Sequence, residues 1–447
     1  MSANSHKGTD EMASSTTGTT VAVATSSQRP VRKPIKLSIC LITYNRARYL
    51  NLALADMFRS QPFDFAFEVV ICDNHSTDDT PKIVADWQSR HPEIRSVRQK
   101  SNVGPAGNMA TAYRLSKGEF CVYLADDDRL VPEQVAAVIR YMETNSNIVV
   151  CHAPWEYWDD LHKEVRGQFY KLPEEKVFSK GSAVELFNML VQLRLLPEIC
   201  IYRSSVLHRM YTLPYNAYWA FVHLAHALDY GDVAFLPKPF YRQLVLGDIP
   251  KSIEHAGLFY SVHHRDSFVS GFEYFAQKAF RYLGVPHVPP GQVEQLQKMI
   301  VEFGSAQLEV CVRLLTDMKN FRGAYEFVVR QQANGRCPDE KAAELRPVLM
   351  MRAAIQGFIE TFEGISVAEQ VALYGFPDPE HWRTLLLEQR PSMTVRFLTK
   401  DTLGHIEHPE RIFVMTAPGS DIQPLIAAGF MPGFLIDQND LARLYTL

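Results

Sequence analysis

Short apolar runs alternate with segments of helical spacing along the first half of the chain. Four continuous apolar runs are typical of strands covered on both faces of a sheet, at residues 37–44, 67–74, 119–125 and 147–154. Between them, apolar side chains recur three or four positions apart, as in residues 46–61 and 132–145. This alternation predicts right-handed crossovers and a mostly parallel sheet with helices on both faces.

The remaining segments have a different character. Residues 1–34 are rich in Ser, Thr, Gly and Ala, and we expect a disordered tail because they cannot bury enough apolar surface. Residues 256–390 have mainly helical spacing without a fixed repeat, and residues 391–447 return to an alternating pattern that predicts a small βαβ segment. These boundaries leave residues 35–255 as the main α/β domain.

The composition is that of a soluble globular protein, with 47% hydrophobic and 21% charged residues among 447. A net charge of −4 and the lack of clustered Lys and Arg argue against nucleic acid as a partner. No apolar stretch approaches the roughly 20 residues of a membrane span, and the N-terminus lacks the layout of a secretory signal. The seven cysteines lack metal-ligand spacing, and four lie in or beside apolar runs, so we expect a reducing cytoplasm.

The stretch YLADDDRL (123–130) places three consecutive aspartates where an apolar run ends. They could cap the following helix and lie in solvent, since Pro132 indicates a helix start. They could equally hold Mg²⁺ or Mn²⁺, whose charge would relieve their mutual repulsion. Thr43 and Asp73 also fall at predicted strand ends, and ligands of parallel sheets bind beyond the carboxyl ends of strands. The shared location favours a metal site in one cleft.

Five stretches, taken in order, resemble family 2 glycosyltransferases with the GT-A fold, over about residues 36–245. They are LITYNR (41–46), VVICDNHSTDDT (69–80), NVGPAGN (102–108), GEFCVYLADDDRL (118–130) and GDVAFLPKPFYR (231–242). The resemblance implies a GT-A type, Rossmann-like α/β fold, followed here by the mainly helical region and the small C-terminal piece. It also implies a nucleotide-sugar donor, Mn²⁺ or Mg²⁺, and inverting transfer to a hydroxyl of a glycan or lipid-linked precursor.

Residue by residue, the resemblance implies that Asp128 is the main metal ligand, with Asp126 as a second ligand. Asp73 would accept from the nucleotide base, and Asp127 would lie near the ribose. The full implied donor-binding set is Thr43, Tyr44, Asn45, Arg46, Asp73, Asn74, Asn102, Gly104, Asn108, Asp126 and Asp127. One position departs from the family pattern, because Ala125 stands where an aspartate is usual.

The expected catalytic base is also absent from its usual place. Counting back from the closing stretch, the acidic pair of inverting members falls at Trp219-Ala220, and neither side chain can accept a proton. His223, one helical turn later, is the candidate base, since imidazole takes up protons near neutral pH. Alternatively, His223 packs in the interior.

Two other functions remain open from the sequence. A sugar nucleotidyltransferase uses a related sheet, but it usually has a glycine-rich loop after the first strand, and TYNRARYL has no glycine. A non-catalytic nucleotide-sugar binder would account for Trp219-Ala220. The helical region could shape the acceptor site or mediate self-association, and a lipid-linked acceptor would bring peripheral contact with a membrane.

Overall fold

The computed structural model describes residues 34–443, except for residues 60–61, 194, 211–216, 248–264, 283, 285–289, 334 and 336. The expected disordered tail therefore lies outside the described residues, apart from Pro34. Within the described part, every helix is too short or too polar to cross a bilayer.

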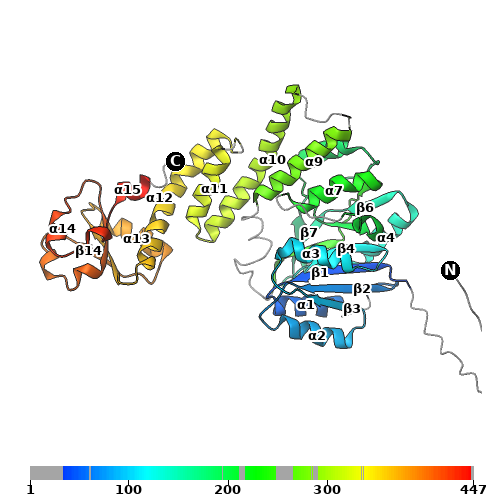
Figure 1. Ribbon diagram of the computed structural model, residues 1–447, viewed down its shortest axis with the longest axis horizontal. Helices are drawn as coiled ribbons and strands as arrows, with labels where there is room; N and C mark the ends of the chain where they lie inside the picture. Colours follow the sequence, from blue (N-terminus) through cyan, green and yellow to red (C-terminus); the bar gives the residue numbers. More distant parts are fainter. Residues whose placement is uncertain are drawn as a thin grey trace, which may run out of the picture. The chain divides into compact units, whose positions relative to one another are not determined.

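An eight-stranded sheet forms the core of the α/β part (Figure 1). Its strands are β1 (Leu37–Thr43), β2 (Phe67–Asp73), β3 (Ile94–Arg98), β4 (Phe120–Ala125), β6 (Ile148–His152), β9 (Lys176–Phe178), β10 (Cys200–Arg203) and β11 (Asp232–Phe235). The order across the sheet is β3-β2-β1-β4-β10-β6-β11-β9. All these strands run in one direction except β9 and β10, which are antiparallel to their neighbours.

Helices cover both faces of this sheet. The residues of β1 and β2 are almost all buried at successive positions, and successive side chains point to opposite faces. The helices are α1 (Ala47–Met57), α2 (Thr80–Arg90), α3 (Gly104–Leu115), α4 (Pro132–Thr144), α5 (Ala183–Leu193), α6 (Ser204–Leu207) and α7 (Trp219–Tyr230). Among them, α3 packs on β1 and β2, and α7 packs on β6 and β11.

A second, smaller sheet is formed by segments of the chain that follow the three aspartates. It contains β5 (Arg129–Leu130), β7 (Trp155–Asp159), β8 (Glu164–Gln168) and β12 (Tyr241–Leu246), in the order β5-β12-β7-β8. Strand β12 pairs with β5 in antiparallel fashion and with β7 in parallel. This pairing brings the end of the α/β part back to the segment that directly follows the three aspartates.

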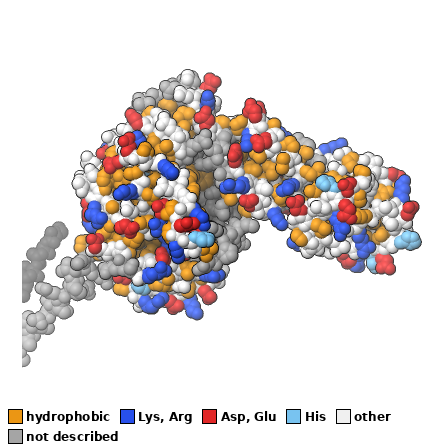
Figure 2. Space-filling model, turned by 180° about the vertical axis from the view of Figure 1, so that it is seen from behind, with side chains coloured by type: hydrophobic (Ala, Val, Ile, Leu, Met, Phe, Trp, Pro, Cys, Tyr) orange, Lys and Arg blue, Asp and Glu red, His pale blue; other side chains and the backbone are white. Residues whose placement is uncertain are grey.

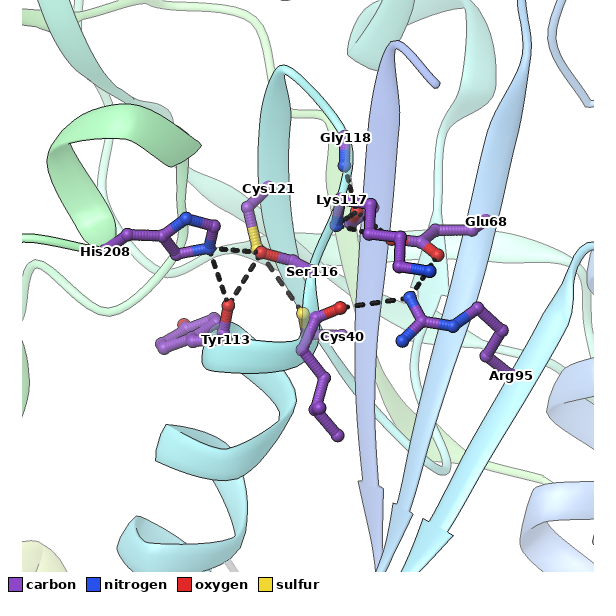
Figure 3. Close-up of polar contacts among 11 residues, drawn as sticks. Cys40, Glu68, Arg95, Tyr113, Ser116, Lys117, Gly118, Cys121 and His208 are labelled. Carbon is purple, nitrogen blue, oxygen red and sulfur yellow. Dashed lines mark hydrogen bonds and ion pairs between the residues drawn. The ribbon is translucent and has the colours of Figure 1, made fainter. Parts of the chain in front are cut away.

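A polar network closes the amino end of the main sheet, opposite to the strand ends that carry the aspartates (Figure 3). The buried carboxylate of Glu68 accepts hydrogen bonds from the Ser38 hydroxyl at 2.6 Å and from the Lys117 amide at 2.6 Å. Arg95 lies 2.6 Å from its other oxygen. Because Glu68 is 2% exposed, these donors compensate the cost of burying its charge.

The C-terminal part contains helices and a third sheet. The helices are α9 (Arg265–Tyr282), α10 (Pro290–Asp317), α11 (Phe321–Ala333), α12 (Asp339–Gly364), α13 (Pro379–Gln389), α14 (Gln423–Ala427) and α15 (Gln438–Arg443). The strands are β13 (Gln370–Tyr374), β14 (Val395–Leu398), β15 (Ile412–Thr416) and β16 (Leu435–Asp437), with three 3₁₀ turns at Leu403–His405, Pro409–Arg411 and Pro432–Phe434. This sheet is wholly parallel, in the order β14-β13-β15-β16.

The expected architecture is confirmed: an α/β domain with a large, mostly parallel sheet precedes a mainly helical region. One difference concerns the C-terminal sheet, whose β13 already begins at Gln370, within the range expected to be helical. The run QVALY is only five residues long and begins shortly after α12 ends at Gly364, so its strand character depends on pairing with β14 and β15. Acidic and basic side chains are interspersed on the face shown in Figure 2.

Candidate active site

Three strand ends meet at the carboxyl edge of the main sheet. Thr43 and Asp73 are register partners at the ends of β1 and β2, and Ile42 pairs with Ala125 at the end of β4. The three ends are therefore level, and Asp126 follows directly at this edge. The sequence-based expectation that these residues share one location agrees with the register.

The turn after β1 is fastened to the loop after β2. Asn45 has a φ of 52°, a left-handed conformation that asparagine tolerates better than most residues. Its amide donates to the Ser76 hydroxyl at 2.9 Å, and its side-chain oxygen accepts from the Thr77 amide at 2.7 Å. The neighbouring Tyr44 side chain is 42% exposed, so this turn offers an aromatic surface to solvent or ligand.

Asp73 is 3% exposed, and its carboxylate is engaged by the chain itself. One oxygen accepts from the Ser76 amide at 2.9 Å, and Arg98 lies 3.1 Å from the other. These contacts shape the loop that holds the Asn45 turn. The structure thus gives Asp73 a direct role in ordering the site, in addition to the base contact expected from the resemblance.

The asparagines expected near the donor form a second network at the start of α3. Asn74 donates to the side-chain oxygen of Asn102 at 2.8 Å and accepts from the Val103 amide at 2.9 Å. The Gly104 amide also donates to Asn102, and Gly104 has a φ of +74° that favours glycine. Asn108 is buried and donates to the carbonyl of Cys72 at 2.7 Å, so it supports the end of β2 from below.

Arg46 bridges the first two aspartates. Its guanidinium lies 2.9 Å from the Asp127 carboxylate and 3.2 Å from that of Asp126, and it also stacks over Tyr49. Both carboxylates are less than 9% exposed. Burial raises the pKa of Asp126 to about 7, and the Asp127 charge adds to this, although Arg46 acts in the opposite direction.

Asp128, the expected main metal ligand, has different contacts from its two neighbours. The Tyr241 hydroxyl donates to one of its oxygens at 2.8 Å, and the Leu244 amide donates to the other at 2.9 Å. Both donors lie on β12. Asp128 therefore fastens the second sheet to the end of β4, which is a structural role.

Because Asp128 has these contacts, few side chains remain as ligands for a divalent cation in the described part of the chain. Among the described residues, no three His, Cys, Asp or Glu side chains are grouped as a cation site. The Oδ2 atom of Asp126, however, is buried and meets no hydrogen-bond donor within the described part of the chain. A buried carboxylate oxygen of this kind suits Mg²⁺ or Mn²⁺, which complete their coordination with phosphate oxygens and water. Asp126 and Asp127 thus fit a cation better than Asp128 does.

His223, the candidate base, lies inside α7 and is 3% exposed. Its Nδ1 is 3.4 Å from the Tyr202 hydroxyl, and its ring contacts those of Trp219 and Tyr113. Burial, with a smaller effect of the nearby His226, lowers its pKa to about 4. None of its contacts within the described residues is with the aspartates, so the structure does not group this candidate with them.

Glu198 is a candidate site residue that the sequence patterns did not reveal. It lies two residues before β10 and accepts a hydrogen bond from the Tyr218 side chain. Burial raises the pKa of its carboxyl group above the usual range. The available signal was a lone carboxylate next to the apolar run ICIY, but Glu198 precedes its strand, whereas the other candidate residues follow theirs.

Comparisons with known proteins match the part of the chain that forms this edge of the sheet. Residues 38–203 match the model of the family described as glycosyl transferase family 2, a segment that includes β1, β2, β4 and the aspartates. An uncharacterised protein of Mycobacterium tuberculosis is 27% identical over 212 residues, which are 45% of this chain and 56% of that protein. The chain thus spans about half the length of the curated relatives that it matches.

Abequosyltransferase RfbV of Salmonella typhimurium is 30% identical over 116 residues, covering 26% of this chain and 35% of that enzyme. Among solved structures, Staphylococcus aureus TarS 1–349 in complex with UDP-GlcNAc aligns with 80% of this chain and 93% of its own. Its sequence identity is 16% and its TM-score is 0.43. Residues 38–203, which contain the three strand ends and the aspartates, thus match the model of glycosyl transferase family 2.

Proposed function

We propose that the chain is a metal-dependent glycosyltransferase that moves a sugar from a nucleotide-sugar donor to a hydroxyl acceptor. The observation that carries this proposal is the level placement of three strand ends, with Arg46 held between Asp126 and Asp127. The family match over residues 38–203 supports it. We further propose an inverting reaction on a glycan or lipid-linked acceptor in the cytoplasm, as the family resemblance implies.

The nucleoside part of the donor would lie over the Tyr44–Asn45 turn. This turn presents an exposed aromatic ring and is locked by Ser76 and Thr77, so little ordering is needed when a ligand binds. Gly104 would allow the sugar-phosphate to approach the backbone closely, since no side chain intervenes. The carboxylate of Asp73 would act on the base from a loop that it also holds in place.

Asp126 and Asp127 would hold the cation, with Asp128 anchoring β12 behind them. When bound, Mg²⁺ or Mn²⁺ neutralises charge that develops on the departing nucleoside diphosphate. Arg46 lies against the same two carboxylates, and its guanidinium suits bidentate contact with phosphate oxygens. Arg46 would therefore bind and orient the diphosphate while the carboxylates are occupied by the cation.

The proposal is tested with a panel of UDP-, GDP-, dTDP- and CDP-sugars, each with and without MnCl₂. Binding is measured as a rise in melting temperature, and turnover as release of the nucleoside diphosphate. We expect at least one donor to bind and turn over only with the cation. Asp127→Asn should reduce turnover at least a hundredfold, whereas the exposed Asp64→Asn should match the wild type. Binding without turnover by the wild type would favour the non-catalytic binder.

A further inference from the structure

The proposed reaction requires a group that takes the proton from the acceptor hydroxyl. The usual acidic position is occupied by Trp219-Ala220, and the contacts of His223 are with aromatic side chains. We propose that the Glu198 carboxylate is this proton acceptor, an inference that rests on the proposed function. Its support comes from strand register, from the side chains around it and from the direction of the reaction.

Strand register places Glu198 beside the aspartates. β10 runs antiparallel to β4, with Ile201 opposite Val122 and Tyr202 opposite Cys121. Continued one for one past the strand ends, this register sets Glu198 opposite Ala125, next to Asp126. Because β10 runs against its neighbours, the residues that precede it reach the same edge as the residues that follow β4.

The surroundings of Tyr123 lead to the same placement. This side chain, on β4, interacts electrostatically with Glu198 and with all three aspartates. Glu198 and the acidic stretch therefore both lie near the phenol group of Tyr123. Glu198 as a whole residue is half-buried.

Tyr218 holds the Glu198 side chain in a defined position. Tyr218 precedes α7, is 2% exposed, and donates its backbone amide to the Ser267 carbonyl. Its ring packs 4.1 Å from that of Phe268, so its hydroxyl is a fixed donor to the carboxylate. A carboxylate accepts about four hydrogen bonds, and one from Tyr218 leaves capacity for the acceptor hydroxyl.

The proposed reaction needs a proton acceptor on the side of the aspartates that faces away from the nucleotide. The nucleotide is proposed over β1 and β2, and the order β2-β1-β4-β10 puts Glu198 on the far side of β4. In an inverting displacement the hydroxyl oxygen bonds to the anomeric carbon as the bond from that carbon to the diphosphate oxygen breaks. The electron pair leaves with the diphosphate, and the hydroxyl proton passes to the Glu198 carboxylate, so charge and atoms balance.

Burial strengthens Glu198 as a base. It raises the pKa of this carboxyl group, while the Tyr218 hydrogen bond partly offsets the effect. A higher pKa improves proton removal as long as the group stays ionised at the working pH. Asp128 is less suited to accept a proton, because both of its carboxylate oxygens already accept hydrogen bonds from β12.

The test compares Glu198→Gln with the exposed Glu185→Gln as a matched control. Glutamine keeps the shape and can still accept from Tyr218, so the variant should fold. We expect at least a hundredfold loss of diphosphate release at saturating donor, as is typical for loss of a general base. The melting-temperature rise given by the donor, or by UDP and GDP with MnCl₂, should stay within 1 °C of the wild-type rise, and Glu185→Gln should be unchanged.

A second variant separates catalysis from structure. Glu198→Ala should lose turnover equally, and sodium formate should restore part of it, because a small carboxylate can occupy the vacated space. Chloride at the same ionic strength should not. Wild-type turnover in Glu198→Gln would overturn the assignment, as would loss of nucleotide binding together with turnover. A wild-type chain that neither binds nor cleaves any nucleotide sugar would instead overturn the proposed function, and the assignment with it.

Discussion

The guanidinium of Arg46 lies 2.9 Å from the carboxylate of Asp127, at the point where two buried strands end. The same guanidinium is 3.2 Å from Asp126, so a single cation faces two adjacent carboxylates. The two carboxylates are adjacent in a place that is largely shielded from water. Their mutual repulsion favours a proton or a metal ion at the Asp126–Asp127 pair.

Removal of Arg46 should therefore make the protein depend on a divalent cation. In Arg46→Gln two buried carboxylates lose their counter-ion, and we expect a loss of roughly 3–5 kcal/mol in unfolding free energy without metal. Addition of MnCl₂ should recover more stability in this variant than in the wild type, measured by urea unfolding. Arg59→Gln is the control, because Arg59 is 74% exposed and its ion pair with Asp56 lies at the surface. An equal response of both variants to manganese would contradict the placement of the cation.

The three aspartates should separate by their effects on manganese binding. Asp126→Asn and Asp127→Asn should each weaken Mn²⁺ affinity at least tenfold, measured by electron paramagnetic resonance of free Mn²⁺ in the presence of UDP. Asp128→Asn should change this affinity less, because its carboxylate is engaged by Tyr241 and Leu244. If Asp128→Asn had the largest effect, the ligand role expected from the sequence would be restored.

Loss of the Tyr241 hydroxyl should loosen β12. The hydroxyl donates to Asp128 and accepts from the Ala125 amide at 3.2 Å, and Tyr241 is 2% exposed. Tyr241→Phe leaves both groups without this partner, so we expect a loss of about 1–3 kcal/mol. Tyr230→Phe, at a position 37% exposed, should cost much less. Guanidinium unfolding followed by tryptophan fluorescence measures both, and equal losses would argue against a buried hydrogen-bond network.

The buried imidazole of His223 should make the folded protein less stable in mild acid. Its pKa is about 4 in the folded chain, against an ordinary value of 6.5. Between these values the unfolded chain binds the extra proton, so stability falls as the pH drops through this window, by at most about 3 kcal/mol. His223→Leu should flatten the unfolding free energy between pH 6.5 and 4, whereas the exposed His405→Leu should not. The same variant should keep most of its turnover if Glu198 is the base.

Gly118 should be the least replaceable glycine of the main sheet. A Cβ atom at this position would lie 2.5 Å from the Ser38 amide nitrogen and 2.7 Å from the Leu37 carbonyl carbon. Both are backbone atoms of β1 and cannot move without disturbing the strand, so Gly118→Ala should cost at least 1–3 kcal/mol, by roughly the usual penalty for overpacking. Gly291→Ala, where no atom lies within 4 Å, should be neutral or slightly stabilising. Thermal unfolding compares the two.

The edge at which the three strands end was predictable because its signals are local. β1, β2 and β4 are continuous apolar runs, and the candidate residues follow within a few positions, so Thr43, Asp73 and Asp126 could be placed at strand ends from the sequence. Parallel pairing then brings the ends together without further information.

The rest depended on contacts between distant residues. Asp128 accepts hydrogen bonds from Tyr241 and Leu244, which lie 113 and 116 positions further along the chain. Nothing near YLADDDRL therefore indicated that this carboxylate fastens a second sheet. The direction of β10 was equally hidden, since four apolar residues do not reveal which way a strand runs. Without that direction, Glu198 could not be placed at the edge occupied by the aspartates.

The reversal of β10 also makes the two halves of the site separable. The loops that leave the parallel strands are proposed to hold the nucleotide, whereas the chain entering β10 carries Glu198, and pairing with β4 and β6 holds that strand on both flanks. The short stretch 195–199 thus carries the proposed base outside every loop proposed to hold the nucleotide, and its Leu195 and Ile199 are part of the buried core. Acceptor choice and donor choice would then be encoded in different parts of the chain, and an engineer could vary one while keeping the other.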